Sequence, residues 1–533
     1  MPEFSEDVDV VIVGSGPTGA TYARVVADAR PRARVLVVEA GPVVAEPPGL
    51  HMSNIIDPAE RERAQIACQG PNQYRYELAA TSGTAHNTAS EDRDRALVTR
   101  PGLFPVGRGD IDGDGFPAAQ ESSNVGGMGS HWFGACPRPN EEERIAFVDA
   151  EVLEDAYLTA ERLLGVSSTQ FLASGFAAHV RRVLGDVLNE GRAPGRRVQA
   201  MPMAVTLTPY GVHRAGPNVI FGGLLDGASP GFELRPETLC EKVIMAGNRA
   251  AGVQLRDRAS GAVTAVRARH VVVAGDSLRT PQLLFASGVR PQALGHYLNE
   301  HPQVSMMAEV EGLGSDTGHE GEIGNATAMS DSTAVTVAGG GVTWIPYEGE
   351  AFPFHGMLSQ IDPDTVHRSA RDRRERKPLV SVHFFVPQQP RFENRLEFSE
   401  TETDWIGMPA MTIHHTLSER DLAVLEHGKT EALRLSHVLG RPADGEAPWI
   451  LPSGSSLHYQ GTVRMGAADD GTSVCDPSGR VWGTENLYVA GNGVIPTKTA
   501  CNPTLTSVAL SVIGARDIAS RLTASTGPVA VRR

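Results

Sequence analysis

The stretch VDVVIVGSGPTGATYARVVADA, residues 8 to 29, decides the fold of this chain. It begins with a short, continuous apolar run rich in valine, which is typical of a strand buried on both faces of a parallel sheet. Gly14, Gly16 and Gly19 follow in a GxGxxG pattern, whose glycines allow a tight turn, a close approach of backbone to a pyrophosphate, and close packing of helix on strand. The N-terminus of that helix then faces the phosphates. The stretch therefore predicts a dinucleotide-binding α/β fold.

A second valine-rich segment, ARVLVVEAG at residues 33 to 41, extends this prediction. It ends in Glu39, about 20 residues beyond Gly19, which is the spacing expected for a carboxylate that binds ribose hydroxyls. The alternative is that Glu39 is simply a solvated strand end. Strand, glycine turn, helix, strand and carboxylate in this order favour a nucleotide site, and both NAD and FAD remain open at this point.

The rest of the sheet is predicted far along the chain. Residues 45 to 125 are polar, rich in Gly, Pro and Asn, and poorly periodic, whereas a simple NAD dehydrogenase usually continues in regular strand-helix alternation. Valine-rich strands ending in glycine recur in RARHVVVAGDS (267 to 277) and ENLYVAGNG (485 to 493), and each precedes a helical pattern. We therefore expect a discontinuous, doubly wound nucleotide domain over 1–145, 230–305 and 450–525.

The inserted region has a different pattern. PLVSVHFFV (378 to 386) and NRLEFSE (394 to 400) alternate as in an antiparallel sheet that is open on one face. We expect an antiparallel-sheet, substrate-binding domain over 306–449, to which 150–229 contributes in part.

Composition excludes several classes of protein. With 63 Asp and Glu against 48 Lys and Arg, the formal net charge of −15 disfavours nucleic acid as a partner. No apolar run reaches the roughly 18 residues of a membrane-spanning helix, and the acidic N-terminus lacks a signal-peptide pattern. Five scattered cysteines indicate neither a disulfide framework nor a metal site. We expect a cytoplasmic protein with no metal, no membrane partner and an open oligomeric state.

Six motifs follow one another along the chain: GSGPTGATYAR with Glu39, NVGGMGSHW, GDSLRTPQLLFASG, YLNEHP, LHYQGTVRMG and NLYVAGNGVIPTKTACNPTLTSVAL. In this order they resemble the glucose-methanol-choline (GMC) family of FAD oxidoreductases, and several look most like its pyranose oxidase and glycoside 3-oxidase branch. The resemblance implies FAD and the oxidation of a secondary hydroxyl, at C2 or C3, of a pyranose sugar or glycoside, with hydride transfer to flavin N5 and electrons then passed to oxygen or a quinone.

The resemblance also implies which residues contact the cofactor. His131 matches the histidine that in pyranose oxidases lies against the flavin and commonly carries it through a covalent bond; covalent attachment and simple packing both stay open. Phe133 stands where the fungal enzymes have a threonine near flavin N5, which weakens the expectation that oxygen is the preferred acceptor. The full implied set is Gly14, Gly16, Gly19, Glu39, Gly127, Ser130, His131, Cys240, Gly491, Asn492 and Thr504.

His458 and Asn502 match the family's catalytic positions. Alcohol oxidation removes a hydride from carbon and a proton from oxygen, and a histidine with an ordinary pKa near 6.5 suits the second task. Asn502 can donate its amide hydrogen to the substrate oxygen, while Thr504 begins a helix whose N-terminal N–H groups would face the flavin. His301, in YLNEHP, is expected to be structural.

The segment VTWIPYEGEAFPFHG, residues 342 to 356, predicts a substrate loop. It gathers Trp344, Tyr347, Phe352, Phe354 and His355, and its Gly and Pro residues favour a loop over a core strand. Aromatic faces there would stack on sugar rings or aromatic aglycones, and packing in the domain core is the alternative. Two other functions stay open: oxidation of a non-sugar alcohol, and a flavin-carrying protein that has lost catalysis.

Overall fold

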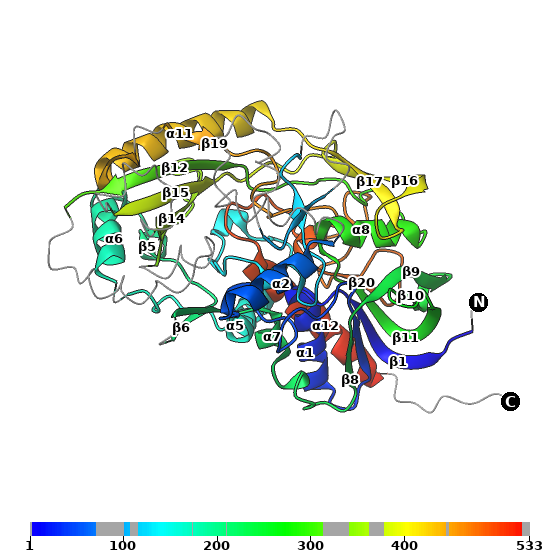
Figure 1. The fold of residues 1–533 in the computed structure, drawn as a ribbon. Coiled ribbons are helices and arrows are strands. Elements are labelled where there is room, and N and C mark those ends of the chain that lie inside the picture. Colours follow the sequence, from blue (N-terminus) through cyan, green and yellow to red (C-terminus); the bar gives the residue numbers. More distant parts are fainter. Residues whose placement is uncertain are drawn as a thin grey trace.

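The computed structural model describes most of the chain, and its elements form two large units that lie side by side (Figure 1). No helix within the described ranges is both long enough and apolar enough to span a bilayer. All five cysteines are buried free thiols. The described residues are 3–70, 101–106, 116–172, 174–208, 211–312, 341–361, 378–443 and 447–524.

The first unit is built on the sheet that the glycine motif predicts. Its parallel order is β8–β2–β1–β11–β20, and β9 and β10 extend it antiparallel from the first half of β11. The ends and the middle of the chain thus share one sheet, which confirms the predicted fold class. The strands are β1 (Glu6–Val13), β2 (Val35–Val38), β8 (Phe232–Arg235), β9 (Thr238–Ala246), β10 (Arg249–Asp257), β11 (Val263–Val273) and β20 (Leu487–Val489).

Helices cover this sheet where the motifs place them. α1 (Pro17–Ala29) packs along α12 (Thr504–Ala524), and a Cβ on Gly514 would lie 1.9 Å from the hydroxyl of Tyr22, so only glycine allows this close contact. α5 (Ala150–Leu164) packs on α12, α7 (Pro217–Phe221) packs on α1, and α8 (Asp276–Ala286) follows β11. α2 (Pro58–Cys68) lies nearby in Figure 1.

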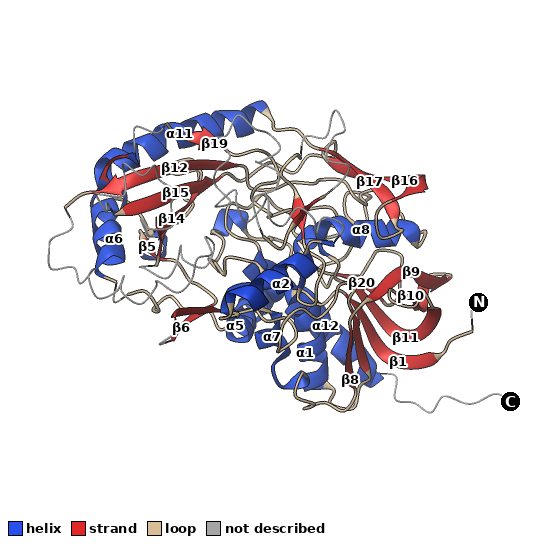
Figure 2. Cartoon of the chain, in the orientation of Figure 1, coloured by secondary structure: helices blue, strands red, loops and turns tan. Residues whose placement is uncertain are grey.

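The second unit is an antiparallel sheet of order β18–β12–β15–β14–β13–β5, with β19 paired to β12. α11 (Glu419–Leu439) lies along its outer face, and α6 (Gly175–Leu188) covers its end (Figure 2). Because side chains alternate along a strand, one face packs on α11 and the other faces the first unit. The strands are β5 (Gln199–Ala200), β12 (Gln303–Val310), β13 (Val342–Ile345), β14 (His355–Ile361), β15 (Leu379–Phe385), β18 (Gly440–Pro442) and β19 (Trp449–Ile450).

Three small hairpins complete the described structure. PLVSVHFFV forms β15 in the large antiparallel sheet, whereas NRLEFSE lies in β16 (Arg395–Thr403), which forms a separate two-stranded sheet with β17 (Pro409–His414). The region 150–229 divides between the units, since α5 packs on α12 and α6 packs on α11. The other pairs are β3 (Phe104–Pro105) with β4 (Gln120–Glu121), and β6 (Val205–Thr208) with β7 (Gly211–Arg214).

Candidate active site

The glycine turn after β1 combines two tight contacts with one open position. A Cβ on Gly14, whose φ is +103°, would lie 2.3 Å from the Ala274 carbonyl, and one on Gly19 would lie 2.0 Å from the Gly14 carbonyl. At Gly16, by contrast, a Cβ would meet only the Gly126 carbonyl at 3.8 Å. Gly14 and Gly19 therefore close the turn, while Gly16 leaves the open backbone that a pyrophosphate requires.

Glu39 ties this turn to the next segment of the site. Its carboxylate accepts hydrogen bonds from the Ser15 hydroxyl at 2.7 Å, the Ser15 N–H at 3.1 Å and the Gly41 N–H at 3.0 Å. Burial raises the pKa of Glu39, and these hydrogen bonds oppose that rise. The Ser15 hydroxyl accepts from the Gly126 N–H at 2.9 Å. The Glu39 side chain thus holds the glycine turn against the GGMGSH segment.

His131 lies at the end of that segment, and one of its ring nitrogens makes no hydrogen bond to the described residues. It follows the short 3-10 helix Gly127–Ser130, and its Nε2 is buried without a hydrogen-bond partner. Burial lowers the pKa of His131 to about 4, so the imidazole is neutral. A neutral ring with an unpartnered nitrogen fits either a covalent link to a flavin or a close packing contact.

Two other predicted cofactor residues are placed by the same part of the fold. The Ser130 hydroxyl is fully buried among Asn124 and the Val125 carbonyl, so its hydrogen bonds hold the loop rather than reach outward. Cys240 is buried in β9, a strand that begins beside Glu39 through the hydrogen bond from Thr238 N–H to the Glu39 carbonyl.

The structure brings His458 and Asn502 together. Asn502 Nδ2 lies 3.3 Å from His458 Nε2, although 43 residues of sequence separate them and they come from different segments of the chain. Gly491 and the short helix Asn492–Val494 lie between them in sequence, and Thr504 starts α12 two positions after Asn502. A donor amide beside an imidazole nitrogen is the arrangement that can hold a hydroxyl and accept its proton.

His301 lies behind His458 and does more than fill space. The Nδ1 atoms of the two rings are 2.9 Å apart, so a proton on one of them bridges the pair. His301 Nε2 is 2.8 Å from the Gln460 amide and 3.1 Å from the Thr499 hydroxyl. Burial lowers the pKa of His301 well below its ordinary value, and the neighbouring His458 lowers it further. Sequence analysis expected a structural role for His301 and did not predict this contact with His458.

Two buried carboxylates hold the segments that carry the pair. Glu300 accepts from the Gly454 N–H and the Ser456 hydroxyl, each at 2.7 Å, and Ser456 in turn accepts from the His458 N–H at 3.2 Å. Burial raises the pKa of Glu300 to about 7. Glu143 accepts from the Ala500 N–H at 2.6 Å, two residues before Asn502. Sequence analysis missed both; the acidic run at 141–143 gave no sign of burial, while Glu300 adjoins a histidine already singled out.

The aromatic segment at 342–356 is not the loop that its glycines and prolines suggest. It contains β13, a short connection and the start of β14, and all of its five singled-out side chains are buried. Phe354 stacks on Phe384 at 5.1 Å between ring centroids and contacts His427 of α11. The expectation that Phe352 and Phe354 stack on the substrate is therefore wrong, because both side chains are buried in the core cluster beneath α11.

Trp344 of β13 and His355 of β14 face the opposite side of the sheet from Phe352 and Phe354. His355 pairs in register with Phe385, whose ring stacks beside His458 at 5.3 Å. Trp344 donates its indole N–H to His355 Nδ1 at 2.9 Å. Trp344 and His355 thus lie on the face of the sheet that is turned toward His458.

Tyr347 lies in the connection between the two strands and packs against the turn at 141–143. Its hydroxyl is 3.4 Å from Glu142, and its carbonyl accepts from Asn140.

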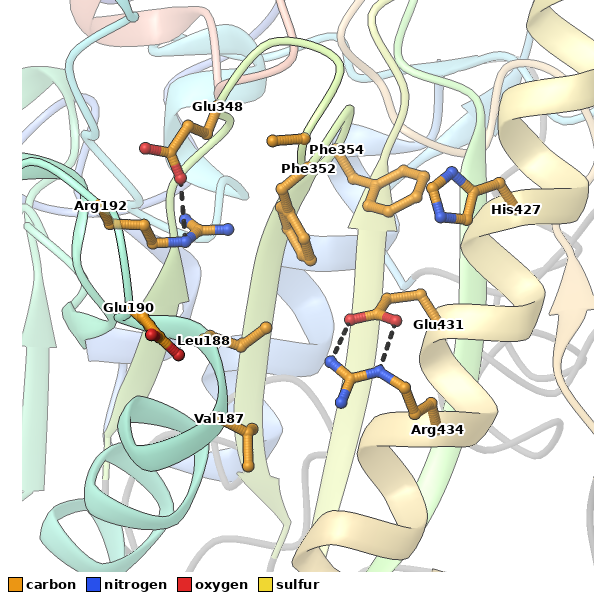
Figure 3. Close-up of a pocket in the computed structure, with 11 residues that line it drawn as sticks. Val187, Leu188, Glu190, Arg192, Glu348, Phe352, Phe354, His427, Glu431 and Arg434 are labelled. Atoms are coloured by element: carbon orange, nitrogen blue, oxygen red, sulfur yellow. Dashed lines mark hydrogen bonds and ion pairs between the residues drawn. The ribbon is translucent and has the colours of Figure 1, made fainter.

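A pocket of about 290 Å³ opens on the α11 side of the sheet, away from the face that is turned toward His458 (Figure 3). Phe352 and Phe354 form its apolar wall. Four of the charged groups that line it form two ion pairs: Arg192 with Glu348 at 3.0 Å, and Arg434 with Glu431 at 2.7 Å; Glu190 lines it as well. The pocket marks the outer side of the second unit and is separate from the His458–Asn502 pair.

The fold and this site together define an alcohol oxidoreductase that uses a dinucleotide cofactor. Models of the GMC oxidoreductase family match residues 222–303 and 390–511. A "C-glycoside 3-oxidase" of Microbacterium trichothecenolyticum is 44% identical over 99% of both chains, and one of Arthrobacter globiformis is 44% identical over 97% of this chain and 96% of its own. The chain belongs to the GMC oxidoreductase family.

More distant relatives agree with this assignment. A "Pyranose 2-oxidase" of Tricholoma matsutake is 28% identical over 98% of this chain and 95% of its own. Among solved structures, that of a formate oxidase variant of Aspergillus oryzae matches 98% of this chain and all of its own chain at a TM-score of 0.64 and 14% identity, which supports the fold alone. The cofactor is FAD, and the open backbone at Gly16 and the unpartnered nitrogen of His131 fit it.

Proposed function

We propose that this chain is an FAD-dependent oxidase of the C3 hydroxyl of C-glycosides. The observation that carries the proposal is the 44% identity with two C-glycoside 3-oxidases over nearly the full length of every chain. The pairing of His458 with Asn502 supports it, because these side chains supply a base and a donor for one hydroxyl group. The more distant pyranose 2-oxidases keep attack at C2 as the second candidate.

The protein's own residues account for the proton half of the reaction. FAD, when bound, takes up the hydride from the carbinol carbon. His458 accepts the hydroxyl proton on Nε2, and Asn502 donates an amide hydrogen to the same oxygen and holds it as negative charge develops. The ring of Phe385 stacks beside His458, which keeps water from one side of the imidazole.

The cofactor would lie between the glycine turn and the catalytic pair. We assign the pyrophosphate to the backbone around Gly16 and Gly127, because a Cβ on either residue would meet nothing closer than 3.8 Å. Glu39 and Cys240 lie where the adenosine half would bind, and His131 where the flavin would. The remaining assignments are Gly491, Asn492 and Thr504, the last of these at the N-terminus of α12, where helix N–H groups favour negative charge.

The acceptor side of the proposal rests on Phe133. Arg214 lies over its ring, and Phe133 has no hydroxyl with which to manage an oxygen adduct. Both oxygen and quinones are proposed as electron acceptors, and the reduced flavin is expected to be reoxidised faster by a quinone. A cytoplasmic location fits the five scattered thiols, which are all free.

Anaerobic reduction of the bound flavin tests the proposal. A panel of C-glycosides, O-glycosides, free glucose and simple alcohols is mixed with the holoenzyme, and bleaching of the flavin band is followed with time. We expect C-glycosides to reduce it fastest, and His458→Ala to keep its FAD while losing this reaction. Reduction by simple alcohols alone would replace the sugar assignment, and the absence of reduction by any of them would leave a flavin-binding protein without this chemistry.

A further inference from the structure

A row of buried polar side chains leads from the second unit to His458. Hydrogen bonds join Trp344 to His355, Asn502 to His458, and His458 to His301. Asn502 also lies close enough to His355 to raise its pKa, which links the two halves of the row. Hydrogen bonds along such a row can run in either of two directions, because each neutral histidine ring and each amide offers a donor on one side and an acceptor on the other. The direction decides which nitrogen of His458 carries the proton.

Trp344 removes this freedom at one end. An indole N–H is a donor only, so the His355 Nδ1 that it meets at 2.9 Å must be an acceptor. Burial lowers the pKa of His355 to about 3, opposed by a hydrogen bond with Asn502, so the ring is neutral. A neutral ring with Nδ1 unprotonated carries its proton on Nε2.

His355 Nε2 carries a buried donor and Asn502 Oδ1 is a buried acceptor, and neither makes a hydrogen bond to the residues that the structure describes. Asn502 raises the pKa of His355, and the two atoms are complementary, so Oδ1 is assigned as the acceptor for the Nε2 proton. When Oδ1 accepts from His355, the Asn502 amide nitrogen is left facing His458 Nε2, as its 3.3 Å separation shows. His458 must then present a lone pair on Nε2 and carry its proton on Nδ1, toward His301.

The far end of the row can adapt to this direction. His301 then accepts on Nδ1 and donates from Nε2, which requires the Gln460 amide to turn its oxygen toward the ring. The Thr499 hydroxyl, which lies 3.2 Å from Gln460 Oε1, would then accept from the rotated amide. The opposite direction would set His355 Nδ1–H against the indole N–H, and an indole cannot accept.

We infer that Trp344 is a positioning residue for catalysis: its N–H fixes the tautomer of His355 and, through the amide of Asn502, keeps His458 Nε2 unprotonated, so that it can accept the proton of the substrate hydroxyl. The inference rests on the proposed roles of His458 and Asn502, and it needs no particular sugar. It gives Trp344 and His355 a role other than stacking on the substrate.

Trp344→Phe tests the inference because it removes the N–H and keeps an aromatic ring. We expect the limiting rate of anaerobic flavin reduction to fall about fivefold, the weight of one neutral hydrogen bond, with KM and FAD content little changed. The pH profile supplies the discriminating readout. Once Asn502 is free to turn Oδ1 toward His458, protonated His458 gains an acceptor, so the acid limb of the rate profile moves to higher pH.

Two substitutions of His355 form a matched pair, one that keeps a hydrogen-bond donor and one that removes it. His355→Gln keeps a donor near the Nε2 position and should stay closer to the parent in both rate and acid limb, whereas His355→Leu should behave like Trp344→Phe. Phe354→Leu, from the α11 face of the same strand connection, is the packing control and should leave the acid limb in place. An unmoved acid limb in both Trp344→Phe and His355→Leu would reduce these residues to packing and overturn the inference. Any alcohol that bleaches the parent flavin serves as substrate, so this result is independent of the sugar assignment.

Discussion

Glu300 makes the stability of this protein depend on pH in a way that one substitution should reveal. Its side chain is 1% exposed, and burial raises its pKa from 4.5 to about 7. The folded state therefore binds the proton more tightly than the unfolded state, so the free energy of unfolding falls as pH rises from about 4.5 to about 7. At about 1.4 kcal/mol for each pH unit, the fall attributable to Glu300 is about 3 kcal/mol.

Glu300→Gln should remove this dependence. Glutamine mimics the protonated acid, since its carbonyl accepts from the Gly454 N–H while its NH₂ donates to the Ser456 hydroxyl. The free energy of unfolding is measured by urea unfolding of the holoenzyme. Between about pH 5 and about pH 8.5, that of the variant should rise by up to about 3 kcal/mol relative to that of the parent. Its flavin reduction rate should stay within about twofold, because the support of His458 is kept.

Glu350→Gln is the control for that experiment, because the Glu350 side chain is 96% exposed and should show no such gain. If Glu300→Gln follows the parent's slope across the same range, Glu300 is ionised in the folded protein and the reasoning from burial is refuted.

Three further predictions concern the reaction itself. His458→Ala should keep FAD but lose flavin reduction by about a hundredfold or more, and Asn502→Ala should lose less because it takes no proton; parent-like reduction rates in either variant would move that role to another residue. Acid precipitation should leave yellow colour with the pellet if His131 carries the flavin and release it in His131→Ala, whereas colour in the parent's supernatant would mean a packing role. Stopped-flow reoxidation should be faster with benzoquinone than with oxygen because of Phe133, and a faster oxygen reaction would contradict that reasoning.

The parts of the fold that local pattern controls were predictable from the sequence. The glycine turn, Glu39, β11, β20 and α12 each follow from a short run of residues whose hydrophobicity and turn chemistry agree. Their assembly into one sheet was predictable as well, because an unfinished parallel sheet requires further strands elsewhere in the chain.

The aromatic segment shows where such reasoning stops. Phe354 and His355 are neighbours in sequence, yet one packs beneath α11 and the other faces the catalytic pair. A one-residue change of strand register exchanges these faces, and no local signal in a Gly- and Pro-rich segment specifies register. The contact between His301 and His458 was hidden for a related reason, since it depends on two distant segments meeting.

The position of the new carbonyl is the most direct measurement of the central claim. A C-glycoside is oxidised to completion by the holoenzyme, with quinone or oxygen as acceptor, and the product is analysed by carbon NMR. The account predicts a single ketone at C3 of the sugar ring, formed about a hundredfold or more slowly by His458→Ala. A ketone at C2, an aldehyde at C6, or unchanged glycoside beside a flavin that other alcohols reduce would contradict it.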